Sequence, residues 1–276
     1  MQTRARLSII ASMAIFGTIG LFVRMIGVSS AELALYRVVI AAALLTGYFL
    51  ISRTRLHLGE IKRELPLLLL SGAAMGFNWI LLFEAYRYTT VAVATLCYYL
   101  SPVIILLLSP LVLKERLTAL KAGCIATALV GMFLVSGVVQ SGGSGFHATG
   151  ILLGLGAAVF YAFIVLCSKQ LKDISAYDTT IMELGISAVV MAVYNLVTVD
   201  LTALTCPPLG LASLAVVAIF HTGVCYALYF GSIAVLPAQT SALFSYIDPV
   251  VAILLSALLL ERLCLRGLRT WRWGSG

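Results

Sequence analysis

Apolar residues run through this chain in nine long stretches that are separated by short polar connections. The stretches cover residues 7–26, 33–52, 65–84, 90–113, 119–139, 149–168, 177–199, 209–231 and 237–260. Each holds about 20 mostly apolar residues, the length of helix that crosses a bilayer core of about 30 Å. Because a backbone in lipid must satisfy its own hydrogen bonds, the pattern predicts helices rather than strands. We therefore predict an all-α, polytopic membrane protein.

Composition supports lipid as the solvent. Of the 276 residues, 62% are hydrophobic and 11% are charged, whereas a soluble domain carries about 25% charged residues. The net charge of +7 comes from Lys and Arg in the short loops, where they set topology rather than form a nucleic-acid-binding face. The stretch 7–26 follows two arginines as a signal peptide would, but it is long enough to span, and we interpret it as the first membrane helix.

Basic residues predict the orientation of the chain. Arg4 and Arg6 precede the first stretch, and the connections 53–64, 114–121 and 169–173 are rich in Lys and Arg. All of these fall on one side of the membrane if the nine stretches are crossed in turn. Because cytoplasmic loops carry the excess of basic residues, we expect an inner-membrane protein with a cytoplasmic N-terminus.

The fourth and ninth stretches repeat one another. Residues 99–113 read YLSPVIILLLSPLVL and residues 246–260 read YIDPVVAILLSALLL, so eight of 15 positions are identical at an offset of 147. A repeat of five helices has an odd number of crossings, so its second copy enters the membrane inverted, an architecture common in transporters. We predict a 5+5 plan with about nine helices present and the tenth missing. Its parts are a first repeat (1–139), a linker (140–148), a second repeat (149–263) and a basic tail (264–276).

The motifs around these repeats resemble the EamA family of the drug/metabolite transporter superfamily. They are Ser101-Pro102-Val103, the segment 113–118 (LKERLT), Leu236-Pro237-Ala238, Asp248-Pro249-Val250 and Arg37 in the second stretch. The resemblance covers about residues 7–263. It implies ten helices, both termini in the cytoplasm, a central cavity between the halves, and export or exchange of amino acids or related metabolites. The tail after Leu263 departs from this pattern, because it holds no apolar run.

Polar residues inside the predicted spans indicate where function resides, because a charge within the bilayer costs at least about 2.5 kcal/mol. Asp248 lies near the middle of the ninth stretch, directly before Pro249. Pro249 and Pro102 occupy equivalent places in the two repeats, and each frees a backbone carbonyl one turn earlier. Interrupted helices at equivalent places are typical of a binding site near the middle of the membrane. Packing kinks with a locally bonded Asp248 are the alternative.

Further residues complete the predicted site. The substrate-cavity candidates are Asn78, Trp79, Tyr98, Tyr99, Ser101, Pro102, Tyr161, Tyr226, Tyr229, Tyr246, Asp248 and Pro249. The charge or proton-relay candidates are Arg37, Glu84, Glu183, His221 and Asp248. Each has a structural alternative: an Arg37–Glu84 pair or a snorkelling Arg37, a salt bridge for Glu183, an interhelical hydrogen bond for His221, and helix packing or interfacial anchoring for the aromatic residues.

These residues favour a secondary transporter of small metabolites, and the resemblance implies amino acids or related compounds as its substrates. The sequence contains no nucleotide-binding motif, so exchange or a proton gradient is the expected energy source. No pair of polar residues has a recognisable catalytic spacing, so we expect no enzyme activity and no cofactor. The six cysteines form no CxxC or Cys/His cluster, so we expect no metal site and interpret the cysteines as packing residues. A non-transporting truncated protein and, less favoured, a membrane-embedded enzyme are the alternatives. Gly72-xxx-Gly76 and Gly150-xxx-Gly154 predict close helix packing.

Overall fold

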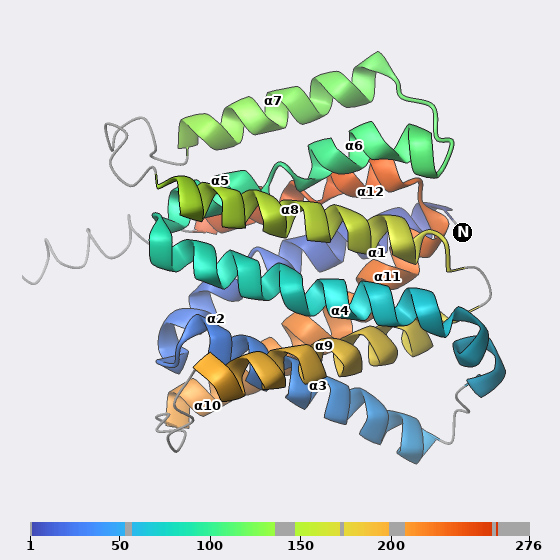
Figure 1. Cartoon of the computed structure of the whole chain (residues 1–276), viewed down its shortest axis with the longest axis vertical. Coiled ribbons are helices and arrows are strands. Elements are labelled where there is room, and N and C mark those ends of the chain that lie inside the picture. Colours follow the sequence, from blue (N-terminus) through green and yellow to red (C-terminus); the bar gives the residue numbers. More distant parts are fainter. Residues whose placement is uncertain are drawn as a thin grey trace, which may run out of the picture.

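The structure, a computed structural model, describes residues 2–52, 57–135, 147–171, 174–198 and 208–255, together with residue 258. Every regular element in these ranges is a helix (Figure 1). The elements are α1 (Gln2–Phe16), α2 (Ile19–Ile26), α3 (Ser30–Ser52), α4 (Leu58–Tyr88), α5 (Val91–Tyr98), α6 (Ser101–Val112), α7 (Ala119–Val135), α8 (Ala148–Ser168), α9 (Ala176–Thr198), α10 (Pro208–Val216), the π-helix η1 (Val217–Val224), α11 (Cys225–Val235), α12 (Ala238–Phe244) and a further helical stretch at 247–255.

Eight segments of the described chain are long and apolar enough to cross a membrane, and α7 is a shorter apolar helix. The prediction of an all-α, polytopic membrane protein is therefore confirmed. One boundary was wrong: α4 has 31 residues and includes 58–64, which we expected to be a loop. Glu60 lies in the first turn of α4, where a carboxylate interacts favourably with the helix dipole. Most of the predicted linker (140–146) and the whole basic tail lie outside the described residues.

Exposure along α9 follows the pattern of a lipid-facing helix. Val197 is 81% exposed, whereas Glu183, Ser187 and Asn195 of the same helix are completely buried. In water this distribution would be unfavourable, because apolar side chains would face the solvent and polar ones the core. In a bilayer it places apolar side chains against lipid and keeps polar groups where other helices can bond to them.

Four of the crossings are irregular. The first is broken at Gly17–Thr18, between α1 and α2, and the eighth passes through η1. The fourth is broken at Tyr99–Leu100, between α5 and α6, and the ninth at Ser245–Tyr246, after α12. These last two breaks directly precede Pro102 and Pro249, so the predicted interruption of both helices at equivalent places is confirmed.

The helices of the two predicted repeats are interleaved. In Figure 1, α4 runs between α8 and α9, and it packs more extensively against these two helices than against α3 or α5. A Cβ atom at Gly76 would lie 2.7 Å from Val190 of α9, and one at Gly154 would lie 3.0 Å from Cys97 of α5. The close helix approach predicted for both glycine pairs is confirmed, because a larger residue would not fit.

Candidate functional site

The irregular segments of the first, eighth and ninth crossings meet inside the bundle. A Cβ atom on Gly17 would lie 2.6 Å from the backbone oxygen of Asp248, so the break in the first crossing lies directly against the ninth. The Thr18 hydroxyl is 2.8 Å from Nε2 of His221, which lies in the π-helix η1. Irregular backbone at membrane depth occurs where protein buries it or where it lines a cavity, so this meeting point is the candidate site.

The fourth crossing joins the same region through a contact between the repeats. The Tyr246 hydroxyl donates a 3.0 Å hydrogen bond to the backbone oxygen of Tyr99. These two tyrosines are the equivalent residues at which the fourth and ninth helices are broken. Equivalent positions of two repeats lie close together when they are near the axis that relates the repeats. The candidate site is therefore at the centre of the predicted two-repeat arrangement.

Arg37 of α3 supplies a cation to this interior. Its guanidinium carbon is 4.5 Å from the ring centroid of Trp79 on α4, a cation–π contact. Its buried Nε atom has no hydrogen-bond partner in the part of the chain that the structure describes. The predicted alternative of an Arg37–Glu84 pair is wrong. Glu84 instead accepts a 2.9 Å hydrogen bond from Arg87 and another from the Tyr194 hydroxyl.

Asp248 supplies a carboxyl group. Its side chain is half-buried, and within the described ranges its carboxylate makes no hydrogen bond or ion pair. Tyr86 and Tyr98 lie close enough to both Arg37 and Asp248 to interact with them electrostatically. Arg37 and the Asp248 carboxyl group therefore share two tyrosine neighbours, and no salt bridge joins them within the described part of the chain. Unpaired charges within a bilayer are unfavourable unless a bound substrate, an ion or water interacts with them.

Aromatic residues connect the two charges. Trp79 forms an edge-to-face contact with Tyr226 at a centroid distance of 6.1 Å, and Tyr226 in turn contacts Tyr229 at 6.4 Å. The Tyr229 and Tyr161 hydroxyls share a hydrogen bond, and Tyr161 also packs edge-to-face on Tyr98. These five residues from four helices form an apolar wall with hydroxyl groups. The structure thus brings together the predicted aromatic residues, and their role in binding stays a prediction.

Other predicted residues have structural partners elsewhere. Asn78 is buried and donates a 2.6 Å hydrogen bond to the backbone oxygen of Ala157, which joins α4 to α8. Glu183 is buried between α4, α8 and α9, where it accepts hydrogen bonds from Ser71 and Ser168. The salt bridge proposed as the alternative for Glu183 is absent among the described residues. Ser101 and Pro102 are buried at the start of α6.

His221 takes its predicted structural alternative, because its Nε2 atom makes the interhelical hydrogen bond with Thr18 described above. The π-helix around it was not predicted, since no sequence signal marks it. In this region the Ser12 hydroxyl of α1 donates a 3.0 Å hydrogen bond to the backbone oxygen of Cys225. All four cysteines within the described ranges are free, as the packing interpretation requires.

A second group of polar contacts lies at the end of the bundle that holds the N-terminus, the starts of α4 and α9, and the α6–α7 and α11–α12 connections. We call it the basic end, and it lies at the right of Figure 1. The Glu115 carboxylate accepts hydrogen bonds from the backbone nitrogens of Ala238 at 2.6 Å and Gln239 at 3.2 Å. It therefore caps the N-terminus of α12 from the other repeat.

Lys169 makes the complementary contact at the C-terminus of α11. Its Nζ atom donates to the backbone oxygens of Ile233 at 3.0 Å and Leu236 at 2.9 Å. Burial lowers the pKa of Lys169, and the nearby Glu115 opposes this shift. Neither contact was predicted, because both residues were assigned to solvated loops.

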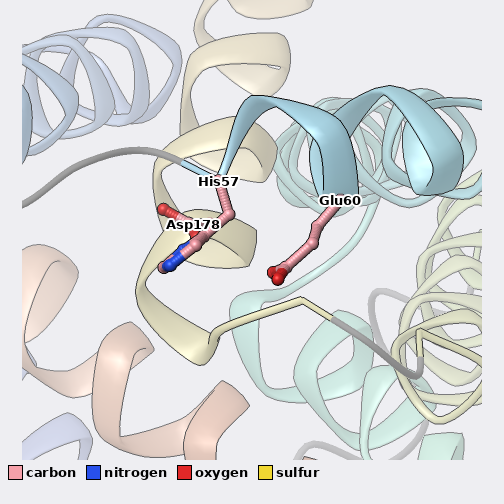
Figure 2. Close-up of side chains that lie close together, drawn as sticks. All are labelled: His57, Glu60 and Asp178. Atoms are coloured by element: carbon pink, nitrogen blue, oxygen red, sulfur yellow. The ribbon is translucent and has the colours of Figure 1, made fainter.

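His57, Glu60 and Asp178 also converge at the basic end. Figure 2 shows the His57 and Glu60 side chains extending from the start of α4 toward the same space beside Asp178. Nδ1 of His57 is 3.1 Å from Oδ2 of Asp178, and this hydrogen bond raises the pKa of His57. One potential ligand atom from each residue lies within 4.8 Å of the others. We expected no metal site, because the sequence shows no Cys/His cluster with metal-binding spacing; His57 and Asp178, which are 121 residues apart, form no such pattern.

The fold and the interior charges define a class: a multi-pass membrane protein with interrupted helices around unpaired charges. The pattern of the EamA-like transporter family matches residues 3–137 and 148–264. The chain therefore belongs to this family, which is part of the drug/metabolite transporter superfamily. It is a membrane transporter in this general sense.

Known proteins agree with this assignment. "Uncharacterized transporter YxxF" of Bacillus subtilis (strain 168) is 30% identical over 256 residues, which cover 92% of this chain and 81% of that protein. A solved crystal structure of a protein that is 18% identical superposes with a TM-score of 0.83 over 94% of this chain and 89% of the other. That likeness shows a shared fold.

Proposed function

We propose that the chain is a secondary transporter, and not an enzyme, that exports or exchanges small metabolites such as amino acids by alternating access. The observation that carries this proposal is the pair of unpaired charges, Arg37 and Asp248, that share an aromatic interior at interrupted helices. No described residue neutralises either charge through an ion pair. A substrate that carries both a carboxylate and an ammonium group would neutralise both.

The chemistry of Arg37 and Asp248 suits a zwitterion. The planar guanidinium of Arg37 can donate two parallel hydrogen bonds to a carboxylate. The Asp248 carboxylate can accept hydrogen bonds from an ammonium group. The aromatic wall between them offers contact area for an apolar or aromatic side chain, with hydroxyl groups that fix its orientation. Amino acids are therefore the substrate class that this site favours.

Alternating access requires parts that move as units. Because the two repeats are interleaved, we propose units defined by packing rather than by the boundaries 1–139 and 149–263. One unit is α4 with α8 and α9: α4 packs extensively on both helices, and Gly72 and Gly76 bring it close to α9. The other is α1 with α11 and the 247–255 stretch, which Gly17 joins. The site residues come from both units and from α3 and α5. Exchange or a proton gradient would supply the energy.

We further propose that the protein resides in the inner membrane with the basic end in the cytoplasm. The contacts of Glu115 and Lys169 support the arrangement of the loops. They join Glu115 of the 114–121 connection and Lys169 at the end of α8 to the connection 236–238, and the basic residues favour the cytoplasm for this end. A reporter fused within 140–148 should report the opposite, outer side.

Flux in proteoliposomes tests this proposal. The purified chain is reconstituted, and transport is measured for a panel of amino acids, the amines that lack their carboxylate and the acids that lack their amino group. We expect flux for an amino acid and much less for its two analogues. Asp248→Asn and Arg37→Gln should abolish flux, and Arg87→Gln, which removes an exposed arginine paired with Glu84, should retain it. Unchanged flux in Asp248→Asn would refute the assigned role of Asp248. A correctly inserted chain that moves no compound supports the non-transporting alternative.

A further inference from the structure

We propose that His57, Glu60 and Asp178 form a binding site for a divalent transition-metal ion at the basic end of the bundle. The three residues come from both predicted repeats. His57 and Glu60 lie at the start of α4 in the first repeat, and Asp178 lies at the start of α9 in the second. An ion bound by all three would link the first turns of these two helices (Figure 2). This site is separate from the interior charges, so the inference does not depend on the proposed transport function.

The distances suit one ion with little rearrangement. Metal–ligand bonds of about 2.1 Å place two ligands of one ion about 3.0–3.4 Å apart, for octahedral and tetrahedral geometry respectively. Nδ1 of His57 and Oδ2 of Asp178 are already 3.1 Å apart. The Glu60 carboxylate lies within 4.8 Å of both. It accepts no hydrogen bond from any described residue, so a rotation of its flexible side chain can bring it to the same ion.

The local structure fixes two elements of the site. His57 is the N-cap of α4 and Glu60 follows three residues later, a spacing that places both side chains on one face of a helix. Asp178 is buried, and the Ser175 hydroxyl accepts a 3.0 Å hydrogen bond from its backbone nitrogen. Helix α9 thus presents a fixed carboxylate, and α4 presents two adjustable ligands.

A comparison with the first repeat shows that the Asp178 carboxylate serves more than helix capping. Ser29 and Glu32 precede Ser175 and Asp178 by 146 residues, one fewer than the offset of the fourth and ninth stretches, so we take Glu32 as the repeat equivalent of Asp178. Glu32 forms a complete capping box: its carboxylate accepts a 2.9 Å hydrogen bond from the Ser29 backbone nitrogen, and the Ser29 hydroxyl accepts one from the Glu32 backbone nitrogen. At α9 only the second half of this box is present, between Asp178 and Ser175. The Asp178 carboxylate instead contacts His57. Glu32 thus caps its own helix in the first repeat, whereas the equivalent Asp178 in the second repeat contacts a residue at the start of α4.

The ligand types indicate which ions fit. One imidazole nitrogen and two carboxylates suit Zn²⁺, Mn²⁺, Co²⁺ or Ni²⁺, whereas Mg²⁺ and Ca²⁺ prefer oxygen ligands alone. With a neutral imidazole, the two carboxylates balance the charge of a divalent ion. In a simple His57–Asp178 ion pair, Glu60 would serve only the dipole of α4 and the charge of His57. The metal site accounts for all three residues.

Binding of Co²⁺ tests the inference, because its visible absorption reports the number and type of ligands. Tag-free protein in lipid nanodiscs is freed of metal and titrated with Co²⁺, then with Zn²⁺ in competition. We expect one saturable site per chain that Zn²⁺ displaces and a large excess of Mg²⁺ does not. His57→Gln and Glu60→Gln should each weaken binding at least about tenfold, which is about 1.4 kcal/mol. Both residues are at the surface, so these variants should fold normally.

His147→Gln is the matched control, because His147 is likewise the N-cap of a helix, α8, and has no acidic cluster beside it among the described residues. It should bind Co²⁺ as the unaltered chain does. Glu60→Gln separates the metal site from the ion pair alone, since the ion pair does not require Glu60. Co²⁺ binding that is unaffected by His57→Gln and Glu60→Gln, or equal affinity for Mg²⁺, would overturn the inference.

Discussion

Replacing Glu115 by Gln should make the basic end open more often. Glu115 accepts hydrogen bonds from the backbone nitrogens of Ala238 and Gln239, and in this way it joins the α6–α7 connection to the start of α12. Glutamine has almost the same shape, but it carries no charge and has only one acceptor oxygen. The substitution therefore removes one hydrogen bond and the interaction with the helix dipole, and it leaves the packing in place.

The magnitude follows from these contacts. A hydrogen bond to a charged group contributes about 1.5–3 kcal/mol. If the contact exists only when the basic end is closed, its loss shifts the equilibrium toward the open state by about 10-fold to 150-fold. A smaller shift is expected only if the open state keeps part of the contact. The substitution should change the global stability less, because the remaining acceptor can still bond one backbone nitrogen.

Thiol labelling measures this shift. Ser241 of α12 is 1% exposed, and its hydroxyl oxygen is buried, so Ser241→Cys provides a thiol that reacts only when the basic end opens. We expect a membrane-impermeant maleimide added at that end to label it at least tenfold faster in Glu115→Gln. Glu32→Gln is the matched control, because Glu32 caps a helix within its own repeat, and it should leave the rate unchanged. Equal rates in the two variants would refute the closing role of Glu115.

Three further substitutions test the packing of the interior through the melting temperature in detergent. Gly76→Ala places a Cβ atom 2.7 Å from a side chain of α9 and should destabilise the protein by about 1–3 kcal/mol, whereas Gly185→Ala has open space and should be neutral or stabilising. Tyr246→Phe removes the hydrogen bond between the two helix breaks and should cost about 0.5–1.5 kcal/mol; the exposed Tyr48→Phe should have no effect. Thr18→Val removes the 2.8 Å contact with the π-helix histidine and should cost a similar amount, and a melting temperature that stays unchanged would contradict that contact.

Most of the fold could be predicted because lipid restricts the chain to helical crossings with enough apolar residues to span the bilayer. The breaks in the fourth and ninth helices were also predictable, since Pro102 and Pro249 remove backbone donors at fixed positions. The break at Gly17 and the π-helix around His221 were not. Neither contains a proline, and both depend on contacts with helices that are distant in the sequence.

Pairings between side chains were harder to predict than the residues themselves. Arg37 and Glu84 were both identified as important, but their proposed pairing was wrong because it depends on how two helices are rotated. Arg87 lies one turn from Glu84 on the same helix and forms the ion pair with it instead. The cluster at His57 and Asp178 was missed for a similar reason, because no local pattern relates residues that meet only after four further helices have folded.

The interleaving of α4 with α8 and α9 has a consequence for how the chain is made. Synthesis proceeds from the N-terminus, so the first five crossings enter the membrane before α8 and α9 exist. Until then Ser71 and Asn78 of α4 lack the hydrogen-bond acceptors that α9 and α8 provide in the finished protein. The surface of α4 at Gly72 and Gly76 likewise lacks α9, the helix that packs against it. We therefore expect the first repeat to remain an unfinished bundle that depends on lipid, water or a chaperone, and to reach its final packing only when the second repeat is inserted.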